Sequence, residues 1–287
     1  MPPLSPTVIA WELGFRVRES REAAGLTAVN AAARLGISQN FLSDLEHGKR
    51  KLTEAKIDAM IELYDIDHEE QEELRSMLRT SVQRGWWTKY SGIFTAEVLR
   101  YFGYEHGAES IQTHESLLIP GLLQTEDYAY AVVTSDGPNI RTSEAAQRVE
   151  VRRRRQERLT GDDPLVLAAV FSEGALKQQV GGRAVMAGQL RHLMTMIESH
   201  PETLDVRVVP FSAGAHGALG ASTFHILHFP NGRLPQVAWQ ENVTASSVME
   251  QRPKVGQFSA TFSESFNLAA DRNESLEIIR RELAEIG

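Results

Sequence analysis

The chain has 287 residues, which is long for a single domain and sufficient for two. Its 42% hydrophobic and 24% charged residues are ordinary for a globular protein, and the lack of cysteine excludes disulfides, thiolate metal sites and a cysteine nucleophile. The net charge of −8 argues against a protein that coats nucleic acid without sequence preference, although a small positive face on one domain still allows DNA binding.

Nothing in the sequence indicates a membrane segment. No apolar run approaches the roughly 18 residues that a membrane helix needs. Residues 1–7 carry prolines and no basic cluster, so they do not resemble a signal peptide. The absence of cysteine fits a reducing compartment. We therefore expect a cytoplasmic protein that does not associate with membranes.

The first 80 residues are dense in helix formers, and residues 7–119 contain no proline. N-capping Ser and Thr residues and helix-ending glycines divide this stretch into five predicted helices. The predicted helices cover residues 8–24, 28–35, 39–46, a segment after Thr53, and residues 68–80. In the segment after Thr53, Ile57, Met60, Ile61 and Tyr64 recur at helical spacing. The N-caps are Thr27, Ser38 and Thr53, and the first three helices end at Gly25, Gly36 and Gly48.

The composition changes after Gly85, and the remainder mixes helical with β-rich segments. Apolar or alternating runs predict strands at 165–171, 204–210, 222–229 and 234–239, and Pro230-Asn231-Gly232 is a hairpin signal between the last two. Long helices are predicted at 143–159, 183–199 and 274–285. The sequence thus predicts two domains: an all-α five-helix bundle with a helix-turn-helix over residues 1–82, and an α+β domain over residues 83–287.

Residues 25–50 contain the most informative pattern. Two short predicted helices are separated by a tight turn at Gly36, and Ala32 is small enough for them to approach closely. Apolar residues on both sides of the turn supply a wedge between the helices; they are Leu35, Ile37, Leu42 and Leu45. The segment carries LGIS at 35–38, LS at 42–43, Glu46 and GKR at 48–50. This pattern resembles the helix-turn-helix of the Xre family, the Cro and CI-like phage-repressor type.

The resemblance implies that the second helix of the motif lies in the major groove, with its N-terminal residues against base edges. By position, Gln39 and Asn40 would read adenine, and Asp44 would accept from cytosine. Ser43 would touch a base or a phosphate. Glu46 is expected to be structural, since family members use that position to hold the fold together.

We expect contacts to DNA phosphates from residues at the helix ends. Phosphate contacts dominate the affinity of a protein for DNA and set the salt dependence of that affinity. The candidates are Thr27, Ser38, Lys49, Arg50 and Lys51.

Two departures leave the target sequence open. Ala28 stands where the family often has a phosphate-binding glutamine, and an aspartate at position 44 costs affinity unless a cytosine or a nearby arginine compensates it. The alternative interpretation of the region is a plain five-helix bundle with solvated lysines, or one converted to protein interaction.

Residues from about 85 onward resemble the domain of unknown function that follows the helix-turn-helix in many actinobacterial regulators, including WhiJ-type ones. PGLLQT at 120–125 and RRRRQ at 152–156 are its specific parts. The resemblance marks a candidate partner or ligand region, comprising Trp86, Trp87, Gln124, Tyr128, Arg152, Arg155 and Glu173.

The four arginines of RRRRQ lie on a predicted helix, where successive side chains are about 100° apart and cannot all face one partner. Arg152 and Arg155, three residues apart, share a face. They either form salt bridges with acidic groups such as Glu115 or Glu173, or bind an anion.

No chemistry-bearing motif accompanies these elements. His216, His225 and His228 match no familiar metal-binding spacing, and on a strand His225 and His228 face opposite sides. No nucleophile elbow, P-loop, HExxH or Rossmann fingerprint occurs. We therefore expect no metal, no cofactor, no catalytic residues and no enzymatic activity.

The sequence favours a DNA-binding transcriptional regulator, a repressor in our prediction, that binds double-stranded operator DNA as a homodimer. Half-sites would lie about 34 Å apart. The second domain would respond to a small protein encoded nearby or to a ligand. Two alternatives stay open: an antitoxin-like interaction protein that neutralises a neighbouring small protein, and a small-metabolite-responsive regulator.

Overall fold

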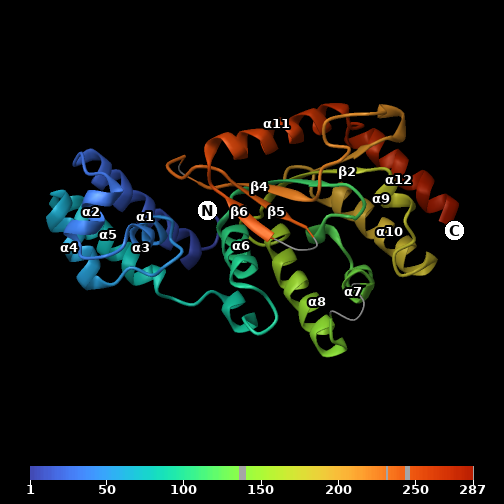
Figure 1. Cartoon of the computed structure of the whole chain (residues 1–287). Coiled ribbons are helices and arrows are strands. Elements are labelled where there is room, and N and C mark those ends of the chain that lie inside the picture. The colour runs from blue at the N-terminus through green and yellow to red at the C-terminus, as the bar shows by residue number, and fades with distance from the viewer. Residues whose placement is uncertain (136–139, 231, 243–245, 287) are drawn as a thin grey trace. The chain divides into compact units, whose positions relative to one another are not determined.

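The computed structural model describes residues 1–135, 140–230, 232–242 and 246–286 (Figure 1). The chain forms two compact units. The helical unit comprises Pro3–Gly92 and Phe102–Gly107, and the sheet unit comprises Met1–Pro2, Ile93–Tyr101 and Ala108–Gly287. A helical bundle followed by a mixed sheet with helices confirms the predicted fold class.

All five predicted helices of the first domain are present. They are α1 (Pro6–Ala23), α2 (Ala28–Arg34), α3 (Gln39–Glu46), α4 (Glu54–Tyr64) and α5 (His68–Ser81), followed by the 3₁₀ turn η1 (Trp86–Tyr90). Helix α1 begins two residues earlier than predicted because Ser5 caps it and Pro6 occupies its first turn, where a missing N–H costs nothing. The Ser5 hydroxyl also donates to the Gly103 carbonyl, 2.6 Å away.

The local signals around the turn act as predicted. Thr27 and Ser38 cap α2 and α3 by accepting from the backbone N–H of Asn30 and Phe41, both at 3.2 Å. Gly36 has a φ of +65°, which an L side chain rarely adopts, so it permits the tight turn between the two helices. Leu42 and Leu45 are buried in the core of the unit, and Leu35 and Ile37 pack against it.

Helix α3 lies unusually close to α1. A Cβ at Gly14 of α1 would lie 2.4 Å from the Leu45 carbonyl oxygen, and a Cβ at Gly48 would lie 2.6 Å from the Cα of Trp11. Neither position has room for a side chain, so two glycines set the distance between α1 and α3.

The sheet unit is built on one six-stranded sheet, in the order β3-β2-β1-β4-β5-β6. The strands are β1 (Ser110–Glu115), β2 (Val166–Ser172), β3 (Leu204–Val209), β4 (Phe224–His228), β5 (Val237–Glu241) and β6 (Ser246–Met249). Strands β3, β2 and β1 are parallel, whereas β1, β4, β5 and β6 are successively antiparallel.

The four predicted strands are confirmed as β2 to β5, and the antiparallel β4–β5 pair confirms the hairpin, although Asn231 lies outside the described residues. Strand β5 starts at Val237 rather than 234, after Pro235, which has no N–H to donate to a ladder. The central strand β1 and the edge strand β6 were not predicted.

Helices cover both faces of the sheet (Figure 1). Helix α11 (Arg252–Leu268) packs on one face through Val255 and Phe262. On the opposite face, Tyr101 of α6 (Ala96–Gly107) stacks on Trp239 of β5 with ring centroids 4.6 Å apart. The remaining helices are α7 (Glu126–Ser135), α8 (Thr142–Gln156), α9 (Gly174–Lys177), α10 (Arg183–Ser199) and α12 (Arg272–Ile286), which confirm the three predicted long helices. Within the described part of the chain, no helix combines the length and the apolar character that crossing a membrane requires.

Gly14→Ala tests the close approach of α1 and α3. The added methyl meets backbone rather than a movable side chain, so we expect the helical unit to lose about 1–3 kcal/mol of unfolding free energy. Gly188→Ala in α10 is the control, because a Cβ added there would meet no atom within 4 Å beyond its chain neighbours and the backbone of its own helix, and it should gain about 0.5–1 kcal/mol. Native-state hydrogen exchange measures both. A neutral or stabilising Gly14→Ala would contradict the close packing.

Candidate nucleic-acid interface

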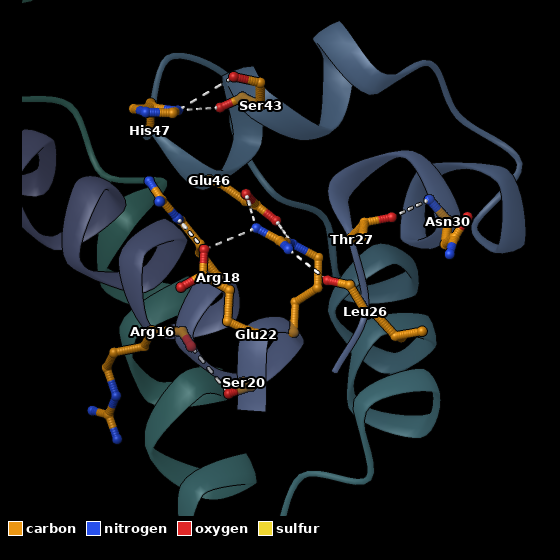
Figure 2. Close-up of polar contacts among 11 residues, drawn as sticks. Arg16, Arg18, Ser20, Glu22, Leu26, Thr27, Asn30, Ser43, Glu46 and His47 are labelled. Carbon is orange, nitrogen blue, oxygen red and sulfur yellow. Dashed lines mark hydrogen bonds and ion pairs between the residues drawn. The ribbon is translucent and has the colours of Figure 1, made fainter. Parts of the chain in front are cut away.

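The N-terminus of α3 presents two amide side chains to solvent. Gln39 and Asn40 are exposed, while Ser43 and Asp44, one turn later, are half-buried. The Ser43 carbonyl and hydroxyl contact His47 Nδ1, at 2.7 and 3.4 Å (Figure 2). The exposed amides match the position from which a helix in the major groove reads base edges.

Asp44 has a partner within the chain. Its carboxylate lies 3.1 Å from Arg50 Nε, and its carbonyl accepts from the backbone N–H of Lys49 and Arg50 at 2.8 and 3.2 Å. The sequence required a cytosine or a nearby arginine to offset this aspartate, and the structure supplies the arginine. Arg50, predicted as a phosphate contact, is therefore shared with Asp44.

Two cationic side chains lie over the ring of Phe41. The Arg50 guanidinium lies 5.3 Å and the Lys56 ammonium of α4 lies 5.1 Å from the ring centroid, within cation–π range. Lys56 was missed from the sequence because it follows the motif, and only the fold brings it to Phe41.

The other predicted phosphate contacts lie at the helix ends. Thr27, Ser38, Lys49 and Lys51 are all exposed. The hydroxyls of Thr27 and Ser38 accept backbone N–H groups as N-caps, which leaves their own protons to donate. The Lys51 ammonium donates to the Val82 carbonyl at 3.3 Å, beside the end of α5.

A buried ion pair fixes the other end of α3. Glu46 accepts from Arg21 Nε at 2.6 Å and from Nη2 at 3.1 Å, and Arg21 Nη1 donates to the Leu26 carbonyl at 2.7 Å. Figure 2 labels Glu46 and Leu26, the two residues that accept these hydrogen bonds. The two side chains are only 7% and 4% exposed. The hydrogen bond to Glu46 raises the pKa of Arg21. The expected structural role of Glu46 is confirmed.

In the sheet unit, the PGLLQT segment is held by side-chain amides. Gln124 Nε2 donates to the Ile119 carbonyl at 2.7 Å, and its Oε1 accepts from Arg152 of α8. Gln156, at the end of α8, donates to the carbonyls of Gly121 and Gln124 at 3.2 and 2.6 Å.

A third side-chain amide, that of Gln189 on α10, also binds this segment. Gln189 accepts from the Thr125 N–H at 2.7 Å and donates to the Leu123 carbonyl at 2.8 Å. The two most specific sequence segments of this domain, PGLLQT and RRRRQ, therefore contact each other, and these contacts are structural.

Glu173, one of the acidic groups considered as a partner of Arg152 and Arg155, has other partners. Glu173 accepts from the Phe211 N–H at 2.8 Å and pairs with Arg281 at 3.5 Å, because it follows β2 and faces the loop after β3. Arg152 instead donates to Gln124, and Arg155 donates to the Tyr101 hydroxyl at 3.3 Å.

The candidate partner or ligand region is only partly brought together. Tyr128 is fully buried, and its hydroxyl accepts from the Ile119 N–H at 3.3 Å, beside Gln124. Trp86 and Trp87 belong to the helical unit, where Trp86 stacks on Phe102 with ring centroids 6.5 Å apart.

Glu115, the last residue of β1, is a buried carboxyl group. Burial raises its pKa to about 8, against an opposing hydrogen bond from Thr223. Sequence patterns do not reveal this environment, because β1, the strand that carries Glu115, was not predicted.

His225 of β4 makes structural contacts. His225 Nδ1 lies 2.7 Å from the Thr113 hydroxyl, and its ring stacks on Tyr101. Within the described ranges, no group of three or more His, Asp or Glu residues is arranged to hold a metal ion.

The fold and this surface define a helix-turn-helix DNA-binding regulator with a second, α+β domain. Residues 12–74 match a family model described as a helix-turn-helix domain. Residues 98–281, more than half of the chain, match the model of a domain of unknown function, DUF5753, and the chain belongs to that family. No curated protein and no solved structure matches the chain.

Glu46→Gln tests the buried pair. The variant leaves the buried Arg21 guanidinium with only the exposed Glu22 carboxylate, 3.4 Å from its Nη2, as a counter-charge, so we expect a loss of about 3 kcal/mol in unfolding free energy by urea titration. Asp58→Asn is the control, because its pair with Arg75 is exposed and worth less than about 1 kcal/mol. Equal losses in both variants would contradict the anchoring role of Glu46.

Glu115 predicts a pH dependence of stability. Because folding raises its pKa from 4.5 to about 8, the folded state holds the proton more tightly, and stability falls as pH rises through that window. Glu115→Gln removes the titration, so the variant should gain stability relative to wild type between about pH 5 and about pH 8, as measured by urea unfolding. A constant difference between the two proteins would contradict a buried, titrating Glu115.

Proposed function

We propose that the protein is a sequence-specific transcriptional repressor that binds a palindromic operator as a homodimer and has no enzymatic activity. The observation that carries this proposal is the exposed pair Gln39 and Asn40 at the N-terminus of α3. Lysines 49, 51 and 56 lie on or beside the segment that follows this helix, where phosphates would be contacted. Footprinting of the DNA upstream of its own gene at modest salt tests it, and no protected site there would overturn it.

Within this proposal, the protein is a WhiJ-like actinobacterial regulator whose DNA binding is tuned through the sheet unit by a small protein encoded nearby. The support is the order of the two matched domains, with a domain of unknown function directly behind the helix-turn-helix. Co-purification with a small neighbouring protein tests it. A change in operator affinity when the partner is added would separate tuning from mere association.

The second candidate is an antitoxin-like interaction protein. Residues 1–82 carry ten Lys and Arg against fourteen Asp and Glu, an acidic balance that disfavours DNA. Much of the negative charge lies in α5, where Glu70 and Glu73 pair with the buried Arg16 of α1. An absence of DNA binding together with stable binding of a small neighbouring protein would favour this candidate.

Two substitutions separate base recognition from phosphate binding. Gln39→Ala should relax sequence preference at a cost of about 1–3 kcal/mol, because its amide reads a base edge. Lys49→Ala should weaken binding to all sequences alike and reduce the salt slope by about one. Arg191→Ala, which removes an exposed charge of α10, is the control. A change of sequence preference in Lys49→Ala but not in Gln39→Ala would reverse these assignments.

A further inference from the structure

One face of the sheet carries a row of polar side chains at the end of β1. Thr113, His225 and Trp239 are paired across β1, β4 and β5. Because side chains alternate along a strand, Glu115 and Glu241, two residues further along β1 and β5, lie on the same face. Thr223, two residues before His225, lies between them and donates to Glu115.

Arg152 of α8 faces this row. It interacts electrostatically with both Glu115 and Glu241, although no ion pair of Arg152 with a carboxylate is found among the residues that the structure describes. Its Nη1 donates to Gln124, and its Nε and Nη2 have no hydrogen-bond partner among the residues that the structure describes. The side chain is half-buried, so these donors keep access to an incoming group.

The two acids differ in environment. Glu241 is exposed, whereas Glu115 is 6% exposed, and burial raises its pKa to about 8, so most of it is protonated at neutral pH. Burial also lowers the pKa of Arg152, but only to about 10, so its guanidinium stays charged. The row therefore presents Arg152 and Glu241 as opposite charges that are held apart, beside a neutral carboxyl group, and a second guanidinium, that of Arg155, lies over the Tyr101 ring.

Charges that are partly buried without a counter-ion are costly unless something else compensates them. Aromatic rings lie beside these charges. The Tyr101 ring stacks on those of Trp239 and His225, with ring centroids 4.6 and 5.6 Å apart. Separated opposite charges beside an aromatic wall match a small molecule that carries opposite charges of its own.

We propose that Arg152, Glu241, Glu115 and Thr223 bind a small zwitterion of the α-amino acid class. The ligand carboxylate contacts Arg152 Nε and Nη2 and accepts from the protonated oxygen of Glu115, whose other oxygen accepts from Thr223. The ligand ammonium donates to Glu241. The fork of the guanidinium fits a carboxylate with two parallel hydrogen bonds. This site uses the sheet unit alone, so its occupancy does not depend on the proposed DNA binding.

Thermal unfolding of the full chain with each common α-amino acid, at constant ionic strength, tests the proposal. At least one should raise the melting temperature in a saturable way, because a ligand that binds only the folded state stabilises it. The N-acetylated and the C-amidated forms of the same amino acid, which lack one charge each, should not.

Variants assign the effect to the site. Arg152→Gln should abolish the shift, and Glu241→Gln should weaken binding by about tenfold or more. Arg153→Gln, an exposed neighbour on the same helix, should bind as wild type. Glu241 is exposed, so Glu241→Gln remains decisive even if Arg152→Gln fails to fold. The proposal is overturned if no amino acid gives a saturable shift, if the N-acetylated form binds equally, or if Glu241→Gln binds as wild type.

Discussion

The geometry of the proposed DNA-reading surface depends on the buried pair of Arg21 and Glu46. A single guanidinium joins α1, the C-terminal turn of α3 and the Leu26 carbonyl that precedes α2, so three segments share one charge. The glycines at 14 and 48 allow the close approach that this pair needs, since a side chain at either position would push α3 away. The exposed residues of α3 are thus positioned by groups that solvent barely reaches.

The sheet unit uses a different device. Around PGLLQT, where only the short 3₁₀ turn Gly121–Leu123 pairs backbone groups, the amides of Gln124, Gln156 and Gln189 bind further backbone groups. An amide both donates and accepts, so one side chain can serve an N–H and a carbonyl together. The segments that best identify this family therefore maintain the fold beside the proposed ligand row, and only Arg152 belongs to both.

Local sequence rules predicted most of the helical unit, because helix caps, turn glycines and apolar spacing each determine structure within a few residues along the chain. They failed at β1, whose sequence SIQTHE has a single aliphatic residue, because Thr113 and Glu115 are buried by contacts from distant segments. For the candidate interface, the sequence identified the exposed amides of α3 but not Lys56. It named an arginine as the condition for tolerating Asp44 without identifying Arg50 as that arginine. Such partners across loops depend on the folded chain rather than on spacing.

The contact between Asp44 and Arg50 has a consequence for discrimination between DNA sites. An arginine engaged by a carboxylate of its own protein is withheld from phosphates until that carboxylate finds another donor. A cytosine amino group opposite Asp44 would release Arg50 to the backbone, whereas another base would leave the two together. Random DNA would then be bound through one cation fewer than the operator. This difference raises the ratio of specific to non-specific affinity, although no individual contact is stronger.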